Sequence, residues 1–295
     1  GLLKIDSFPP IPFNKYIESI FEHRGIKTYD DINRFTDSGY FHVQGTFVNG
    51  RRCSCAKAFL KPYQNRTSLK ISKYSQVTKV LIEDKTAVGV EFIKNGKTFQ
   101  VKAKQEVIVS AGSVESPKLL MLSGIGPKEH LQVLGIPVVE DLPVGQNLQD
   151  HLYLDGVVFT VNTSNGDWNV LDETYKYFTT LTGPLRGFSN AAFLNLNSED
   201  RPDVEVLFRV ADKDQIDAVK DSSMDDEFVD SLVEIVSSSS IIEFLPLYLR
   251  PKSTGKILLR STDPSDHPRI FPGYLSHPDD LKVYLKAIRF LISLG

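Results

Sequence analysis

A glycine turn in the middle of the chain has the residue types that bring a helix N-terminus close to a ligand. Residues 106–110 predict a short buried strand, which runs into Ala111 and Gly112. Ser116 then suits an N-cap and Pro117 the first helical position of a helix that ends before the next glycine. The N–H groups at such a helix start can bind a negatively charged or polar ligand. An ordinary strand-to-helix connection is the alternative on local grounds.

The histidines are the other side chains with catalytic potential. His151 is a candidate general base because an unperturbed imidazole titrates near neutral pH. The other five histidines lack the short spacing to one another and to carboxylates that a metal site requires; they are His23, His42, His130, His267 and His277. No Gly-x-Ser-x-Gly sequence occurs. The sequence therefore favours neither a metal site nor a serine hydrolase.

Composition narrows the class of protein further. Of the 295 residues, 41% are hydrophobic and 24% are charged, which predicts a folded chain with a large core. Lys and Arg number 34 against 37 Asp and Glu, so nothing in the charge balance favours a nucleic-acid partner. No apolar run approaches the roughly 20 residues that a membrane-spanning helix needs. Cys53 and Cys55 are too close in sequence for an unstrained disulfide.

The elements that must position the glycine turn begin with strands. Residues 1–65 predict loops with one short helix at 16–21. From residue 69 onward, alternating and β-branched runs with an Asn95-Gly96 hairpin signal predict a β-meander. The predicted strands before the glycine turn are 69–74, 77–82, 88–93 and 98–103.

The pattern changes after residue 150. Alternating stretches predict an antiparallel sheet with helices beside it, and residues 211–240 predict a solvated helix and loop because they are acidic and then serine-rich. Core packing is favoured over lining of a sugar or alcohol site for four aromatic residues, Trp168, Tyr175, Tyr177 and Phe178. The predicted strands are 156–161, 203–208, 241–248 and 255–260, and the predicted helices are 175–181 and 281–294.

Several runs together resemble one family, the glucose-methanol-choline (GMC) oxidoreductases, which are FAD-dependent alcohol dehydrogenases and oxidases. The run at 107–126 is similar to the second signature of this family, and the run at 141–151 (Asp-Leu-Pro-Val-Gly-Gln-Asn-Leu-Gln-Asp-His) follows it. Residues 50–60 and 249–264 add to the likeness, which is greatest to the insect branch that includes glucose dehydrogenases.

The resemblance implies a mixed α+β and α/β fold with FAD as the cofactor. It implies three segments: 1–65, an N-terminal loop and helix segment partly on the substrate side; 66–150, part of a Rossmann-like FAD-binding domain with the β-meander; and 151–295, a truncated substrate-binding domain with the antiparallel sheet. The family extends beyond this chain on both sides, so we expect an internal fragment. The GxGxxG turn that binds the FAD pyrophosphate is absent here.

Three residues are predicted cofactor contacts by the same resemblance. Val77 matches the family valine whose backbone N–H and C=O pair with the adenine edge of FAD, although it could equally be a plain strand valine. Ala111 and Gly112 lie where the backbone approaches the cofactor and side-chain bulk would interfere, with a simple tight turn as the alternative.

Three further residues, Asn147, Asp150 and His151, fall where the family chain crosses from the FAD domain to the substrate domain. Asn and Asp side chains suit such a crossing because they form local hydrogen bonds with the backbone. The catalytic histidine of the family lies beyond Gly295, so no catalytic residue is assigned within this chain.

The predicted function is therefore a fragment of an FAD enzyme that oxidises the CH–OH group of an alcohol or sugar by hydride transfer to flavin. The alternative is a non-catalytic remnant or binding module on the same fold. The sequence leaves open which alcohol is the substrate and whether oxygen or a quinone accepts the electrons. The resemblance implies an extracellular protein, and no partner other than the small-molecule substrate is predicted.

Overall fold

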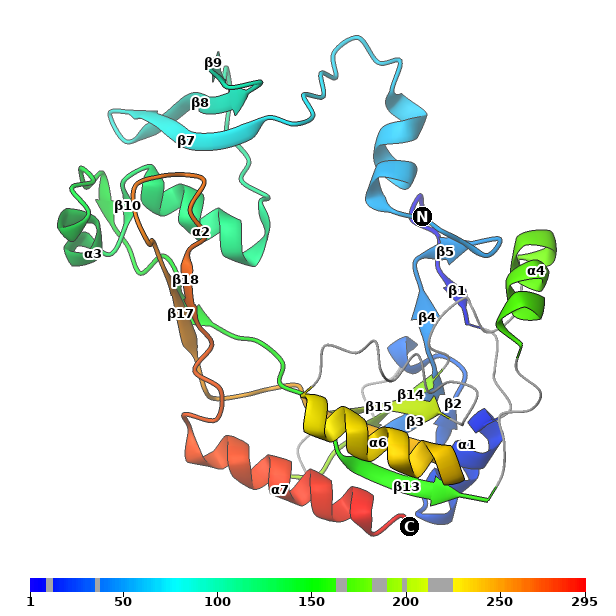
Figure 1. The fold of residues 1–295 in the computed structure, drawn as a ribbon. Helices are drawn as coiled ribbons and strands as arrows, with labels where there is room; N and C mark the ends of the chain where they lie inside the picture. The colour runs from blue at the N-terminus through cyan, green and yellow to red at the C-terminus, as the bar shows by residue number, and fades with distance from the viewer. Residues whose placement is uncertain (9–12, 35–37, 163–168, 182–189, 198–200, 212–224) are drawn as a thin grey trace. The chain divides into compact units, whose positions relative to one another are not determined.

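A computed structural model describes residues 1–8, 13–34, 38–162, 169–181, 190–197, 201–211 and 225–295, which form two compact units (Figure 1). Unit 1 comprises Gly1–Arg66, His151–Arg250 and Pro278–Gly295, and unit 2 comprises Thr67–Asp150 and Pro251–His277. The chain therefore divides beside the boundaries expected after residues 65 and 150. Pro251–His277, which we expected in the last domain, belong to unit 2 instead.

A six-stranded sheet forms the centre of unit 1. Its strand order is β13-β16-β15-β14-β3-β2, with antiparallel neighbours except for the parallel pair β2 and β3. The antiparallel sheet predicted after residue 150 is thus confirmed for three of its four strands. The strands are β2 (Thr28–Tyr29), β3 (Gly39–His42), β13 (Val157–Val161), β14 (Asn190–Leu194), β15 (Val204–Ala211) and β16 (Ser240–Tyr248).

Helices and short strands complete unit 1. The helices are α1 (Phe13–His23), α4 (Val170–Thr180), α6 (Asp226–Ser238), α7 (Pro278–Ile292), the 3-10 helices η1 (Ile32–Arg34) and η3 (Lys61–Tyr63), and the π-helix η2 (Ala56–Leu60). The short strands are β1 (Asp6–Ser7), β4 (Gln44–Gly45), β5 (Phe47–Val48) and β6 (Arg51–Arg52). Cys53 and Cys55 are both free thiols.

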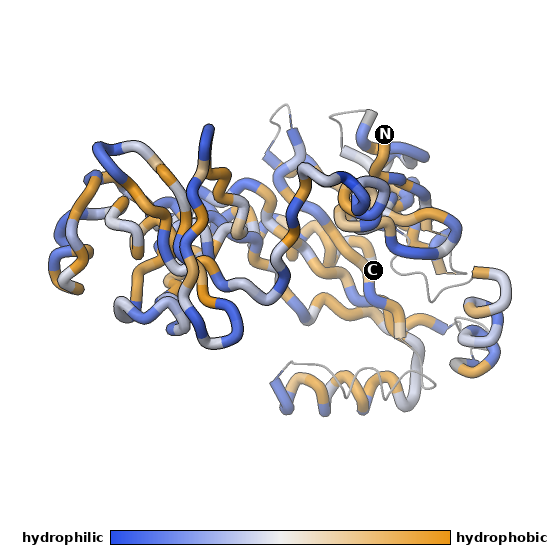
Figure 2. The backbone as a smooth tube through the Cα atoms, turned by 90° about the horizontal axis from the view of Figure 1, so that it is seen from above, coloured by the Kyte–Doolittle hydropathy of each residue, from blue (hydrophilic) through white to orange (hydrophobic). Residues whose placement is uncertain are grey.

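Helices α1 and α7 cover one face of the sheet and form the largest apolar cluster. Alternate residues of β15 are buried, and β16, which is central, is buried almost throughout. Figure 2 shows hydrophobic and hydrophilic residues interspersed along the chain. Ile17 and Phe21 on α1 and Ala287 and Leu291 on α7 pack against this face with no exposed surface. Burial of the larger of these side chains, Ile17, Phe21 and Leu291, stabilises the unit by about 1.5–3 kcal/mol each.

Two interpretations of unit 1 from the sequence are wrong. Helix α6 is not merely solvated, because Val229, Leu232 and Val236 line up at helical spacing and pack on the other face of the sheet. The core packing predicted for the aromatic residues of α4 is wrong for Tyr175 and Phe178, which are 73% and 75% exposed, whereas Tyr177 is half-buried. Trp168, for which we made the same prediction, lies outside the described residues.

Unit 2 contains the β-meander, which confirms the hairpin signals of the sequence. β7 (Gln76–Glu83), β8 (Thr86–Lys94) and β9 (Lys97–Lys102) are antiparallel in that order. The remaining elements are α2 (Gly112–Leu122), β10 (Ile125–Gly126), α3 (Lys128–Val133), β11 (Glu140–Asp141), β12 (Gln146–Leu148), β17 (Gly255–Leu258) and β18 (Arg269–Phe271). β10 pairs in parallel with β11, and β12, β17 and β18 form an antiparallel sheet.

The core of unit 2 joins residues that are far apart in sequence. Met121 on α2 and Leu131 on α3 pack with Ile257 and Leu259 from the β17 segment. This packing explains why 251–277 lie with unit 2, and why the fourth strand predicted after residue 150 is not part of the large sheet.

Three local predictions for unit 2 are also wrong. Residues 106–110 form no strand, since no described residue pairs with them, and Ile108 is 77% exposed. Residues 69–74 likewise form no strand. Helix α2 begins at Gly112, so Pro117 lies inside it, and the Ser116 hydroxyl accepts a hydrogen bond from the Ala111 N–H at 3.1 Å instead of capping the helix at its own position. The predicted end before Gly124 is confirmed.

We predict that unit 2 loses stability in acid through His130. Its Nε2 accepts a hydrogen bond from the Leu259 N–H at 3.0 Å, which requires the neutral ring. Burial, and secondarily Arg269, lower the pKa of His130. The fold therefore favours the neutral form, and its contribution is complete above the ordinary pKa of about 6.5 and is lost as the pH falls through the lowered pKa.

The measurement is the free energy of unfolding in urea between pH 7.5 and pH 5. His130→Gln is the matched control, because its amide oxygen can accept the same bond and does not titrate. The unmutated chain should lose more stability across this range than the variant. Parallel pH profiles would contradict the assignment.

Candidate functional site

The start of helix α2 has an open backbone turn at the predicted cofactor contacts. Ala111 is the N-cap residue and Gly112 has φ +91°, a left-handed conformation that favours glycine. A Cβ atom built on Gly112 would meet no atom within 4 Å, so the space beside it is open. The first-turn N–H groups and the helix dipole make this turn suitable for a polar or anionic group.

The backbone of β8 defines which residues of β7 face outward. In an antiparallel ladder, the peptide groups of successive residues point alternately to the two neighbouring strands. The Val88 carbonyl accepts a hydrogen bond from the Ala103 N–H at 2.8 Å, so Val88, Val90 and Phe92 turn their peptide groups towards β9. Their partners on β7 must therefore turn their own peptide groups away from β8.

These outward-facing residues of β7 include the predicted adenine contact. Val77 pairs with Phe92 and Val80 pairs with Val90. β7 is an edge strand, so the N–H and C=O of Val77 lie on its outer edge, and no bond from a described residue to these two groups is found. The Val80 N–H on the same edge bonds to the Ser123 hydroxyl at 2.8 Å. The sequence alone did not identify Ser123, although it lies inside the matched signature.

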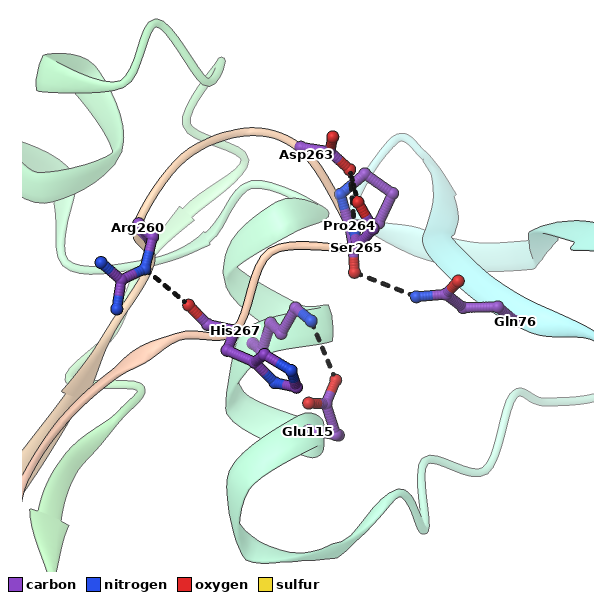
Figure 3. Close-up of polar contacts among 8 residues, drawn as sticks. Gln76, Glu115, Arg260, Asp263, Pro264, Ser265 and His267 are labelled. Atoms are coloured by element: carbon purple, nitrogen blue, oxygen red, sulfur yellow. Dashed lines mark hydrogen bonds and ion pairs between the residues drawn. The ribbon is translucent and has the colours of Figure 1, made fainter.

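A polar loop between β17 and β18 lies against both β7 and α2 (Figure 3). The Gln76 side-chain amide donates to the Pro264 carbonyl at 3.0 Å. On α2, the Lys118 ammonium lies 3.2 Å from the Glu115 carboxylate, and its side chain is only 6% exposed. Hydrogen bonds from Ser265 hold the pKa of Asp263 below its usual value, and the charge of Lys118 adds to this effect. The loop thus reaches both elements that carry predicted cofactor contacts.

Two of the predicted crossing residues occupy defined backbone or side-chain positions. Asn147 has φ +60° within β12, where the register with β17 is irregular. The Asp150 carboxylate accepts a hydrogen bond from the Tyr274 hydroxyl at 2.5 Å, which raises the pKa of that tyrosine. Asp150 thus bonds to a residue far away in sequence. The local backbone bonds expected from the sequence stay a prediction.

His151, the first residue of the second segment of unit 1, is exposed. Burial raises the pKa of Glu205 on β15, and the charge of His151 partly offsets this rise. His151 therefore lies close enough to a carboxylate for a Coulomb interaction. In the described part of the chain, no group of three potential metal ligands occurs, and no helix combines the length and hydrophobicity needed to cross a membrane.

Comparisons of the sequence and of the structure with known proteins point to one family. The family model described as GMC oxidoreductase matches residues 9–153. Ecdysone oxidase of Bombyx mori is 34% identical over the whole chain, and glucose dehydrogenase [FAD, quinone] of Drosophila melanogaster is 33% identical over the whole chain. The chain belongs to the GMC oxidoreductase family. Oxygen-dependent choline dehydrogenase of Brucella canis is 35% identical over 94% of the chain, so insect and bacterial members match to a similar degree.

The chain spans about half the length of these relatives, covering 45%, 47% and 49% of them respectively. Two solved structures share the fold over all of this GMC chain. An FAD-dependent oxidoreductase from Chaetomium thermophilum has a TM-score of 0.79 at 22% identity, with 56% of it covered. A variant of formate oxidase from Aspergillus oryzae RIB40 has a TM-score of 0.79 at 23% identity, with 55% of it covered.

We predict that a side chain at Gly112 lowers the FAD content of the full-length protein. Gly112→Val fills the open space at the turn and forces a β-branched residue into a left-handed conformation, which costs roughly 1–2 kcal/mol in stability. Val77→Ile, which adds one methylene and keeps the backbone edge, should retain more FAD. The measurement is flavin absorbance per mole of purified protein.

The control for backbone strain is Gly135→Val. Gly135 also lies in unit 2, has φ +70° and has no atom within 4 Å of a built Cβ. Gly135→Val should destabilise the protein comparably without lowering its flavin content. Equal flavin content in Gly112→Val and the unmutated protein would remove the close-approach argument.

Proposed function

We propose that this chain supplies the adenine side of an FAD site, in unit 2, and part of the substrate-binding domain, in unit 1, of an enzyme that oxidises an alcohol. The observation that carries the proposal is the unpaired outer edge of β7 at Val77, in the same unit as the open turn at Gly112. An edge peptide offers one donor and one acceptor in the spacing that an adenine edge can pair with. Family membership makes FAD the cofactor that these residues would hold.

FAD would supply the redox chemistry by accepting a hydride from the alcohol carbon. The part assigned to this chain is to bind and orient: the Val77 peptide would pair with adenine, and the Gly112 turn would let the backbone approach the cofactor. The general base would come from outside residues 1–295. His151 would act where the chain crosses from unit 2 to unit 1, because it is the first residue of the second segment of unit 1.

We infer the substrate class from the names of the matched relatives. Ecdysone and glucose both carry CH–OH groups, and their names appear in two of the matched enzymes. We propose a sugar or a steroid-like alcohol as the substrate, with oxygen or a quinone as the electron acceptor. The full-length protein, reduced anaerobically with glucose, ecdysone or choline and then mixed with oxygen or a quinone, would identify both. Failure of every alcohol to reduce bound flavin would favour a non-catalytic binding module.

We predict that residues 1–295 alone do not retain FAD. The chain lacks the GxGxxG turn whose helix terminus binds the pyrophosphate, which is the most concentrated charge on the cofactor. The chain is mixed with excess FAD, desalted, and its visible spectrum recorded. A stoichiometric flavin band that survives the column would contradict this prediction.

We predict that His151→Gln in the full-length enzyme leaves the chemical step largely intact. Loss of a general base lowers the rate by about 10²- to 10⁴-fold, whereas loss of a crossing residue should alter stability or FAD retention. The measurement is the rate of anaerobic flavin reduction at saturating alcohol, normalised to bound FAD. An Ala substitution at the catalytic histidine expected after Gly295 is the comparison. If His151→Gln abolished reduction and that substitution did not, His151 would be the base.

A further inference from the structure

We propose that Ser123 and Gln76 are positioning residues that hold the outer edge of β7 in place for the adenine part of FAD. This inference rests on the proposed function, because it assumes that Val77 on that edge contacts the cofactor. The two side chains make hydrogen bonds on either side of Val77, and each connects β7 to an element distant in sequence.

Ser123 holds the C-terminal side of this edge. Its hydroxyl accepts a hydrogen bond from the Val80 N–H at 2.8 Å and donates one to the Leu119 carbonyl at 2.6 Å. The donated bond fixes the direction of the hydroxyl, so its lone pair faces β7. Ser123 is 2% exposed, so loss of this acceptor would leave the Val80 N–H buried without a partner.

Gln76 holds the N-terminal side of the edge. Its side-chain amide donates to the Pro264 carbonyl at 3.0 Å (Figure 3). The loop that carries Pro264 is itself fixed, because the Asp263 carboxylate accepts bonds from the Ser265 N–H at 2.8 Å and the Ser265 hydroxyl at 2.6 Å. The partner of Gln76 is therefore a preorganised carbonyl.

The need for two attachments follows from an irregularity in β7. The register with β8 shifts between Val77 and Lys79, so the ladder is disrupted next to the outward peptide of Val77. Pairing with β8 alone defines this stretch less firmly than a regular ladder would. Bonds from Gln76 and Ser123, on both sides of the irregularity, restrict the direction in which the Val77 N–H and C=O point.

The first test uses the full-length protein isolated with FAD. Gln76→Glu removes the donor and places a carboxylate beside the Pro264 carbonyl, whereas Gln76→Lys keeps a donor. Gln132→Glu, at an exposed position of α3, makes the same chemical change away from the edge. Gln76→Glu should raise the rate of FAD dissociation by roughly three- to tenfold, the usual effect of one lost hydrogen bond. Gln76→Lys should restore the rate of FAD dissociation of the unmutated protein, and Gln132→Glu should leave that rate unchanged.

The thermal unfolding midpoint of the apoprotein distinguishes a positioning role of Gln76 from a general contribution to stability. Gln76 is exposed, so Gln76→Glu should change FAD dissociation without lowering the apoprotein midpoint. FAD dissociation equal to that of the unmutated protein would overturn the role of Gln76. If the unmutated full-length protein itself held no FAD after desalting, the proposed function would fail instead, so the two failures are distinguishable.

The second test measures the bond to Ser123 directly, in residues 1–295 without cofactor. Amide hydrogen exchange of Val80 should become faster in Ser123→Ala and stay slow in Gln132→Glu. Unchanged protection at Val80 would overturn the role of Ser123. If Ser123→Ala does not fold, the Gln76 series still decides whether the edge is positioned by side-chain bonds.

Discussion

The pairing of β17 with β12 is the constraint on which unit 2 depends. The Ile257 N–H bonds to the Gly145 carbonyl at 2.6 Å, and the Ile257 side chain enters the apolar cluster around Met121. This long-range strand brings residues 251–277 back to a unit whose other residues precede 151. Closing a loop of about a hundred residues costs conformational entropy, and the burial of apolar area must offset this cost.

Three polar contacts exist only because of this return. The β17–β18 loop reaches Gln76, the Leu259 N–H reaches His130, and the Tyr274 hydroxyl reaches Asp150. Each joins the returning segment to a different part of unit 2. The outer edge of β7, His130 on α3 and Asp150 at the crossing therefore all depend on the returning segment, and loss of β17 would affect all three.

The sheet of unit 1 is held together by polar contacts as well as by apolar packing. Glu243 on central strand β16 is fully buried, and burial raises the pKa of its carboxyl. It accepts bonds from Arg209 on β15 at 2.8 Å and from the Gly156 N–H beside β13 at 3.1 Å. A buried carboxylate is costly unless it is paired in this way, so the contacts define how the three strands align.

The sequence by itself determined the features that depend on local patterns. Hairpin chemistry at Asn95-Gly96 and alternation in its flanks predicted the meander, because side chains alternate between the faces of a strand. The signature run indicated the family, and Gly124 as a stop signal predicted where α2 ends. Only the tertiary structure decided which edge of β7 faces outward, that Ser123 and Pro264 hold that edge, and that residues 251–277 belong to unit 2. It also showed that the apolar run at 106–110 forms no strand within the described chain. These features depend on partners distant in sequence, and a strand needs a neighbour for its peptide groups, which hydrophobicity alone does not supply.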